Sequence, residues 1–106
     1  MQELQEIVKL IEEKKAFDIT ILDISKLSIV TDYFIICSAS STQMVKAIID
    51  NVEEKSTIKI LRIEGKTTYR WVVVDFGNII LHVFHQNERE FYNLERLWID
   101  APKVNI

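Results

Sequence analysis

The stretch that decides the fold occupies residues 71–85 and reads WVVVDFGNIILHVFH. Two runs rich in β-branched and aromatic residues, 71–76 and 79–85, are separated by Gly77 and Asn78. Gly and Asn tolerate positive φ angles, which the central positions of a two-residue hairpin turn require. The stretch therefore predicts two antiparallel strands joined by a tight turn.

Three further strands are predicted before this hairpin. Residues 33–38 form an almost continuous apolar run, which is typical of a strand buried on both faces. A run rich in isoleucine predicts a strand over about residues 18–24. Residues 58–64 alternate between apolar and charged side chains and predict the remaining strand.

Two helices are predicted between the early strands. In residues 2–16 the apolar side chains recur at helical spacing, with charged side chains largely opposite them. The Ser-rich residues 38–42 break the strand pattern, and Ser40 or Ser41 can cap a helix that continues to about Lys55. An anion site at this helix start is disfavoured, because the turn contains no Gly and no phosphate-binding Lys follows it.

The last helix is predicted over residues 88–98. Asn87 followed by Glu90 resembles a capping box, in which two side chains satisfy free backbone N–H groups. Pro102 then ends the regular structure. The order of elements predicts a mixed five-stranded sheet flanked by helices, in the α/β (mixed α+β) class. We expect one domain over residues 1–106, because the chain is too short for two.

Composition excludes several classes of protein. Of the 106 residues 48% are hydrophobic, and there are only two Gly and one Pro, which favours a packed core over disorder. The net charge of −3 argues against a sequence-independent nucleic-acid binder, which needs surplus basic residues. No apolar run approaches the roughly 18–20 residues that cross a bilayer. No secretory or transit segment is recognisable either, so we expect a cytoplasmic protein.

Patterns for catalysis and metal binding are absent from the sequence. The only cysteine, Cys37, lies inside an apolar run, where a small buried hydrophobe is favoured over a nucleophile. His82 and His85 are three residues apart on a strand, so they point to opposite faces and do not share a metal. A base–acid pair of Asp75 and His82 is disfavoured against a polar contact, because no nucleophile or cofactor site is nearby. We expect a protein that is not an enzyme and has no cofactor.

The charges are unevenly distributed along the chain. Residues 55–70 contain five basic residues and one acidic residue, whereas residues 71–101 carry a net charge of −3. The acidic segment also contains the aromatic residues Trp71, Phe76, Phe84, Tyr92 and Trp98. An acidic surface with aromatic anchors is typical of a binding face for a basic protein. The alternative is that these aromatic side chains fill the core.

Three motifs resemble the ribosomal silencing factor family, also called RsfS or Iojap. Residues 31–38, TDYFIICS, resemble the TDxxIICTG segment of the family. Glu64-Gly65, the stretch 71–78 and residues 82–84 (HVF) together resemble its EG…WxxxDxGDxxxHxF pattern. Residues 89–98, REFYNLERLW, resemble R…YxLExLW. The motifs occur in the order of the family and span nearly the whole chain.

The resemblance implies a fold similar to that of a small nucleotidyltransferase, and homodimers are known in the family. It implies binding to the large ribosomal subunit through the fourteenth protein in the naming series of that subunit. This protein faces the small subunit, so its occupation sterically blocks subunit joining and lowers translation when nutrients are scarce. Organellar members of the family act in ribosome assembly. Two departures are Ala39, in place of the common Gly, and Asn78, in place of the usual Asp.

The resemblance and the acidic aromatic segment together predict a partner-binding site. Its expected residues are Trp71, Asp75, Phe76, His82, Phe84, Tyr92, Glu95 and Trp98. The aromatic residues are expected to supply apolar anchors, and the two acids to pair with basic groups of the partner. Trp71 and Phe76 are five residues apart, so at least one of them is expected in the core. Alternatively, His82 is a buried histidine bonded to Asp75.

Two other functions compete with this interpretation. A nucleotidyltransferase-like enzyme is disfavoured, because Ala39 replaces the Gly of the Gly-Ser turn and no pair of metal-binding carboxylates follows. A ribosome assembly factor would contact ribosomal RNA through the basic stretch 55–70, in particular through Lys59, Arg62 and Lys66. A peripheral contact of this kind with ribosomal RNA is also compatible with the protein contact.

Overall fold

The computed structural model of the chain describes residues 2–106. In chain order its elements are α1 (Gln2–Glu12), β1 (Phe17–Asp23), β2 (Tyr33–Ala39), α2 (Thr42–Lys55), β3 (Arg62–Glu64), β4 (Trp71–Asp75), β5 (Ile79–His85), α3 (Gln86–Tyr92) and α4 (Leu94–Leu97). The five strands form one sheet in the order β1-β2-β5-β4-β3. The pair β2–β5 is parallel and the other neighbours are antiparallel. The predicted mixed five-stranded sheet flanked by helices is confirmed.

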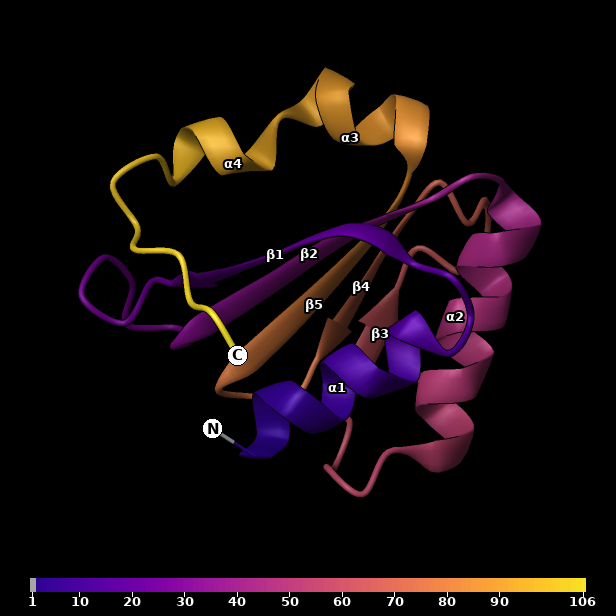
Figure 1. Cartoon of the computed structure of the whole chain (residues 1–106), viewed down its shortest axis with the longest axis horizontal. Helices are drawn as coiled ribbons and strands as arrows, with labels where there is room; N and C mark the ends of the chain where they lie inside the picture. The colour runs from indigo at the N-terminus through magenta and orange to yellow at the C-terminus, as the bar shows by residue number, and fades with distance from the viewer. Residues whose placement is uncertain (1) are drawn as a thin grey trace.

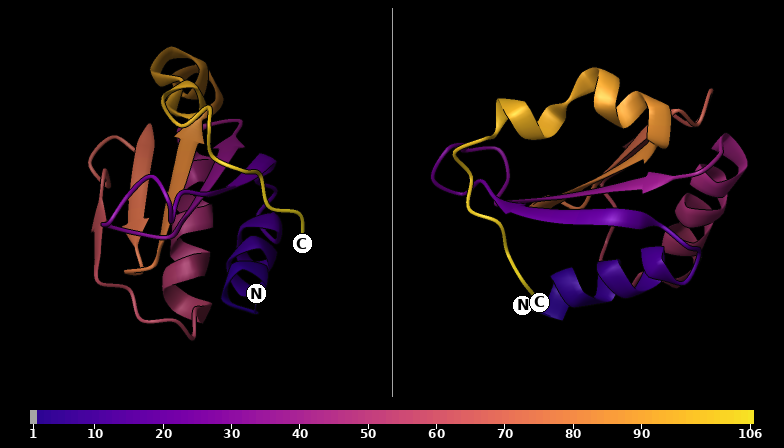
Figure 2. Two further views of the ribbon diagram at one scale, coloured as in Figure 1. Left: turned by 90° about the vertical axis from the view of Figure 1, so that its left-hand side faces the viewer. Right: turned by 45° about the horizontal axis from the view of Figure 1, so that its top comes forward.

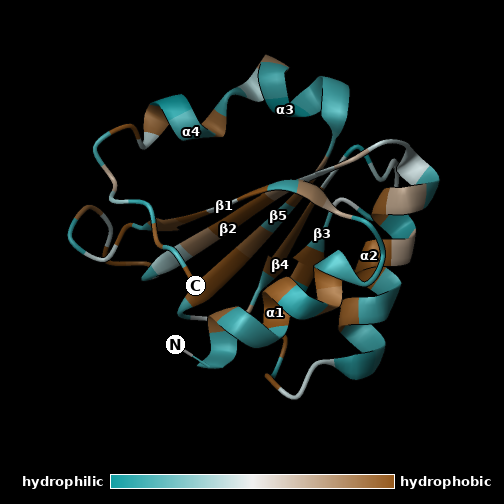
Figure 3. Cartoon of the chain, viewed as in Figure 1, coloured by the Kyte–Doolittle hydropathy of each residue, from teal (hydrophilic) through white to brown (hydrophobic). Residues whose placement is uncertain are grey.

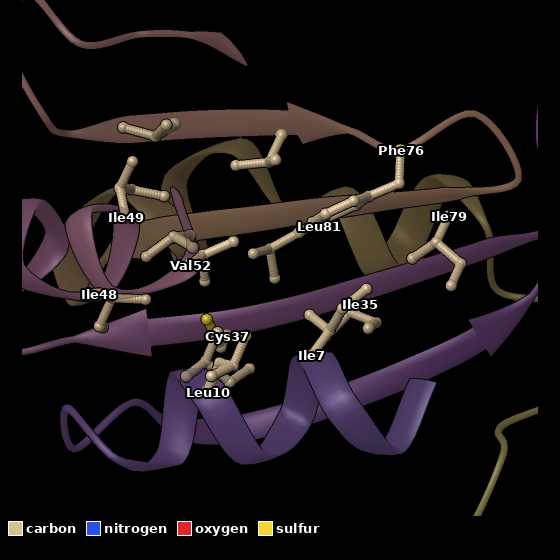
Figure 4. Close-up of a cluster of buried hydrophobic side chains, with 14 of the residues drawn as sticks. Ile7, Leu10, Ile35, Cys37, Ile48, Ile49, Val52, Phe76, Ile79 and Leu81 are labelled. Atoms are coloured by element: carbon tan, nitrogen blue, oxygen red, sulfur yellow. The ribbon is translucent and has the colours of Figure 1, made fainter. Parts of the chain in front are cut away.

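The helices cover both faces of the sheet, as Figures 1 and 2 show. Helices α1 and α2 lie on one face and enclose the larger cluster of buried side chains (Figure 4). Helices α3 and α4 lie on the other face, over a smaller cluster that contains Phe34, Ile36 and Phe84. Successive side chains on a strand point to opposite faces, so Leu81 and Val83 of β5 belong to the larger cluster and Phe84 to the smaller.

The predicted hairpin is confirmed, with β4 ending at Asp75 rather than at residue 76. Gly77 has a φ of +98°, a conformation that is open to glycine at little cost. The Asp75 carboxylate accepts a hydrogen bond from the Gly77 N–H at 2.8 Å. The Phe76 N–H donates to the Ile79 carbonyl at 2.9 Å and closes the turn.

The strand predicted over residues 58–64 is wrong in extent, because only residues 62–64 form β3. Arg62 is paired with Asp75, the last residue of β4. Residues 58–60 therefore extend past the end of their neighbour and have no strand to pair with. The prediction that residues 33–38 form a strand buried on both faces is confirmed, because Ile35 and Cys37 lie in the larger cluster and Phe34 and Ile36 in the smaller one.

Helix α1 ends at Glu12, four residues before the end at residue 16 that its periodicity predicts. Lys15 adopts a left-handed conformation with φ +67°, and the Ala16 N–H donates back to the Ile11 carbonyl at 3.1 Å. This closure is typical of a helix C-terminus. Helix α2 begins as predicted, because the Ser41 hydroxyl accepts a hydrogen bond from the Met44 N–H at 3.1 Å.

The single helix predicted over residues 88–98 is wrong, because the structure has two short helices there. Asn93, at φ +46° and ψ +54°, separates α3 from α4. Asn and Asp are the residues besides Gly that visit this left-handed conformation most readily. The predicted cap at Asn87 is also wrong. Strand β5 leads directly into α3, so the capping position falls on His85, whose Nδ1 accepts from the Asn87 N–H at 3.2 Å.

The outer edge of β1 is partly covered by the C-terminal segment. The Asp23 N–H donates to the Pro102 carbonyl, and the Val104 N–H donates to the Ile21 carbonyl, both at 2.9 Å. These bonds satisfy backbone groups that an open sheet edge would leave free. None of the helices within residues 2–106 has the length and apolar character needed to cross a membrane.

Candidate protein-binding surface

The candidate surface is formed by residues 86–100, which we call the arm. The arm comprises α3, Asn93, α4 and the turn after α4, and it crosses over the face of the sheet opposite α1 and α2 (Figure 1). Neither α3 nor α4 contains a buried residue. The arm therefore contributes only part of its side chains to the core and leaves the rest at the surface.

An aromatic cluster fills the space between the arm and the sheet. Its members are Phe34, Trp71, His82, Phe84, Tyr92 and Trp98. The ring centroid of Trp71 lies 4.9 Å from that of Phe84 and 4.7 Å from that of Tyr92. The ring of Phe34 meets those of His82 and Trp98 edge-on, at 4.6 Å and 5.4 Å. Such offset and edge-on arrangements are the favourable ones for aromatic pairs.

His82 is held in one tautomer by Trp71. The Trp71 Nε1–H donates a hydrogen bond to His82 Nδ1 at 3.1 Å, so the neutral ring carries its proton on Nε2. Burial lowers the pKa of His82 to about 4, and the ring is neutral near pH 7. Within residues 2–106 the buried Nε2 has no hydrogen-bond partner.

The alternative in which His82 bonds to Asp75 is not what the structure shows. The Asp75 carboxylate instead binds the Gly77 N–H and lies 3.6 Å from Arg62 Nε. Asp75 thus stabilises the hairpin turn and pairs with the neighbouring edge strand.

Glu95 is also engaged within the chain. Its two carboxylate oxygens accept hydrogen bonds from Arg89 Nε and Nη2, each at 3.0 Å. A bidentate pair of this kind is among the stronger charge-assisted interactions in proteins. Both expected acids, Glu95 and Asp75, thus already have partners within this chain, and their pairing with basic groups of a binding partner stays a prediction.

The structure moves three of the expected contact residues to the core. Phe84 is fully buried in the smaller cluster, and His82 is 6% exposed beside it. Phe76 is buried on the opposite face, in the larger cluster (Figure 4). The prediction that at least one of Trp71 and Phe76 lies in the core is confirmed by Phe76. Trp71 and Trp98 are half-buried, and Tyr92 is exposed.

Sequence reasoning missed three exposed apolar residues of the arm. Phe91 is 78% exposed, and Leu97 and Ile99 are each 76% exposed. Together with Tyr92 they form what we call the apolar arm surface; Figure 3 shows hydrophobic residues on both helices of the arm. Periodicity did not reveal Leu97, because it lies three residues after Leu94 and its helical spacing predicts that it faces inward beside Leu94 and Trp98. Several large apolar side chains exposed on one short segment make that segment a candidate interaction site.

A second group of exposed apolar residues lies elsewhere. Leu27, Ile29 and Val30 are exposed in the loop between β1 and β2. Their backbone is ordered by local bonds, including the Leu27 N–H to the Ile24 carbonyl at 2.9 Å.

The basic stretch 55–70 is largely paired with acids. Ion pairs join Lys55 to Glu13 at 3.6 Å, Arg62 to Asp75 at 3.6 Å, Lys66 to Glu53 at 2.8 Å and Arg70 to Glu88 at 2.9 Å. Each pair offsets part of the positive charge that the sequence concentrates there. The stretch therefore presents a mixed surface to solvent rather than a uniformly basic one.

The residues with nucleophilic potential have structural environments. Cys37 is buried in the larger cluster, and this burial raises the pKa of its thiol to about 12, as expected for a small buried hydrophobe. The Ser38 hydroxyl accepts from Arg89 at 3.0 Å, and Ser41 caps α2. Among residues 2–106 no three His, Cys, Asp or Glu side chains are grouped so that they could hold a metal ion.

Comparison with known proteins agrees with the motifs. The family described as "Ribosomal silencing factor during starvation" matches residues 1–106. A protein of Halalkalibacterium halodurans named ribosomal silencing factor RsfS is 41% identical over 106 residues, covering 97% of this chain and 91% of the relative. The protein of the same name from Bacillus subtilis strain 168 is 42% identical over 98 residues, covering 90% and 83%.

The fold agrees as well. A crystal structure of a protein from Bacillus halodurans superposes with a TM-score of 0.84 and 37% sequence identity, and the match covers 100% of both chains. The arrangement of sheet and helices described above is thus shared with a solved structure over the full length of the chain. With the match of the family over residues 1–106, these similarities show that the chain belongs to the ribosomal silencing factor family.

Proposed function

We propose that this chain is a ribosomal silencing factor that binds the large ribosomal subunit through its fourteenth protein. Occupation of that protein sterically blocks the small subunit and represses translation. The observation that carries the proposal is the apolar arm surface, present in a chain that matches the silencing family over residues 1–106. The mechanism requires no bond chemistry, only sufficient affinity and bulk at the site of subunit joining.

The direct contacts are assigned to the exposed part of the arm. Tyr92, Leu97 and Ile99 offer large apolar side chains without any rearrangement of the core. Full burial of one such side chain contributes roughly 1.5–3 kcal/mol, so a few of them dominate the affinity of an interface. Trp71 and Trp98 are half-buried and lie at the base of this surface, where they support Tyr92 and the arm.

The members of the expected site that are buried, or that are already paired within the chain, have a supporting role in this proposal. Phe84 and His82 hold Trp71 in place through stacking and a hydrogen bond. Asp75 fixes the hairpin turn, and Glu95 joins the two arm helices. Truncation of these residues is expected to act through the shape of the surface, not through lost contacts to the ribosome.

The free chain is proposed to be a homodimer. Phe91, Tyr92, Leu97 and Ile99 expose more large apolar side chains in one region than a small monomeric domain commonly leaves to water. Light scattering coupled to gel filtration is expected to report the mass of two chains. A monomer mass at all concentrations contradicts this part of the proposal.

The experiment that tests the function is co-sedimentation of the purified chain with isolated large subunits. We expect stable binding by the wild-type chain, and binding weakened by at least about tenfold by Leu97→Asp, because a charge replaces an apolar contact. Leu61→Asp is the matched control, since Leu61 is 57% exposed and lies next to α1, on the other face of the sheet from the arm. It is expected to bind as the wild type does.

Each other outcome has a definite meaning. No binding of the wild-type chain to large subunits overturns the proposed function. Equal loss of binding in both Leu→Asp variants overturns the assignment of the contact to the arm. Binding that is abolished by reversing the charges of Lys59, Arg62 and Lys66, and that falls steeply with salt, favours an assembly factor on ribosomal RNA.

A further inference from the structure

The arm depends on contacts with the rest of the chain for its placement. Helices α3 and α4 are short, of seven and four residues, and neither has a buried residue. Isolated helices of this length are not stable in water. Leu94, Trp98 and Tyr92 pack the arm against the smaller cluster, and polar interactions with the sheet add to this packing.

Among residues 2–106, Arg89 makes the largest number of side-chain hydrogen bonds that involve the arm. Its guanidinium donates to both carboxylate oxygens of Glu95, to Ser38 Oγ at 3.0 Å and to Thr20 Oγ1 at 3.2 Å. It also donates to the backbone carbonyl of Asp18. The side chain is only 13% exposed. One residue of α3 thus contacts α4, β1 and β2.

The backbone of β1 is shaped to receive this side chain. The pairing of β1 with β2 is irregular between Phe17 and Thr20, and Asp18 has a φ of +51°. An irregularity of this kind removes backbone groups from the ladder of the sheet. The carbonyl of Asp18, which accepts from Arg89, is such a group.

The bond to Glu95 also spans the break between the two helices. Asn93 interrupts the backbone hydrogen bonding of a continuous helix, so α3 and α4 are free to take different angles. The pair Arg89–Glu95 crosses this break and fixes the relative orientation of Tyr92 on one side and Leu97 on the other.

We propose that Arg89 is a positioning residue. It fixes the arm to strands β1 and β2 and so holds the apolar arm surface in the geometry that binds the partner. The binding part of this inference rests on the proposed function, and the locking part does not. Arg89 itself is largely shielded by the arm and makes no contact with the partner in this scheme.

The test compares Arg89→Ala with Arg70→Ala. Arg70 is the matched control, because it also pairs with an acid on α3, Glu88, but through one exposed ion pair that is worth little. Amide hydrogen exchange of the free chain is measured in the arm, and exchange in α2 serves as the internal reference. Intrinsic fluorescence is a second readout, since both tryptophans of the chain, Trp71 and Trp98, lie in the aromatic cluster beneath the arm.

We expect Arg89→Ala to raise exchange in residues 86–100 by at least about tenfold, because it leaves the Glu95 carboxylate unpaired and the β1 carbonyl free. Exchange in α2 is expected to stay unchanged, and binding to large subunits to weaken by a similar factor. Arg89→Lys is expected to rescue only part of either effect, because one ammonium group does not span Glu95, Ser38 and Thr20. Arg70→Ala is expected to stay within about twofold of the wild type in exchange of the arm and in binding to large subunits.

Two results overturn the inference. One is unchanged exchange in the arm of Arg89→Ala, and the other is a loosened arm with wild-type binding. Should Arg89→Ala lose protection in α2 as well, Glu95→Gln decides, because it removes the charge pair and keeps the shape. Weaker binding of Glu95→Gln without faster arm exchange identifies Glu95 as a direct contact and also overturns the inference. Failure of the wild-type chain to bind overturns the proposed function, and the exchange data still test the locking.

Discussion

Replacement of His82 by glutamine is expected to remove a large part of the acid sensitivity of the fold. In the native chain burial lowers the pKa of His82 to about 4, against an ordinary value of 6.5. As the pH falls below 6.5, His82 becomes protonated in the unfolded chain but stays neutral in the native chain. The free energy of unfolding therefore decreases as the pH falls from 6.5 toward 4, and this contribution is absent above 6.5.

The magnitude follows from the two pKa values. When the pH is lowered from about 7 to about 4.5, protonation of His82 in the unfolded state lowers the free energy of unfolding of the wild-type chain by about 2.5 kcal/mol. His82→Gln retains an acceptor for the Trp71 Nε1–H and has no group that titrates in this range. The carboxylates whose pKa values are lowered, such as those of Glu6 and Asp23, are present in both proteins, so their effect cancels in the difference.

The assay is urea unfolding followed by far-ultraviolet circular dichroism at both pH values. The expected result is that the difference in unfolding free energy between wild type and His82→Gln shifts by about 2.5 kcal/mol in favour of the variant at the lower pH. A pH-independent difference between wild type and His82→Gln refutes the burial of a neutral His82.

Three further predictions concern the fold. The Cys37 thiol is fully buried and its pKa is raised to about 12, so a thiol reagent is expected to label the native chain only at the rate of unfolding; rapid labelling without denaturant contradicts this. Gly65→Ala is expected to cost at least about 2 kcal/mol in urea unfolding, because its Cβ would lie 2.1 Å from the Trp71 carbonyl oxygen. Gly77→Ala, at a similar φ and with only an ordinary contact to the Leu61 side chain at 3.5 Å, is expected to cost about 1 kcal/mol. Ser41→Ala removes the cap of α2 and is expected to lower the unfolding free energy by about 1 kcal/mol, and no loss of stability contradicts the cap.

The sheet was predictable from local patterns. The Gly77-Asn78 turn and the apolar run of β2 specify their own geometry, since turn chemistry and burial on both faces are written into consecutive residues. The exact length of β3 was not predictable, because it depends on where β4 ends at Asp75, a residue distant in sequence.

The arm was the least predictable part of the candidate site. The capping-box pattern of Asn87 and Glu90 indicated one helix over residues 88–98, yet the left-handed conformation of Asn93 divides it into α3 and α4. Which aromatic residues are buried depends on which face the arm covers, so Phe84 was expected at the surface and Phe91 was not. The bond network of Arg89 joins residues 18, 20, 38 and 95, and such a long-range set leaves no periodic signal in one sequence.

The measurement that tests the central claim most directly is subunit joining. Isolated large and small subunits are mixed with and without the purified chain, and light scattering and a sucrose gradient report the formation of whole ribosomes. The expected result is that the wild-type chain suppresses joining in proportion to its occupancy of large subunits, that Leu97→Asp does not, and that Leu61→Asp does. Full joining on large subunits saturated with the wild-type chain contradicts steric silencing and favours a role in assembly.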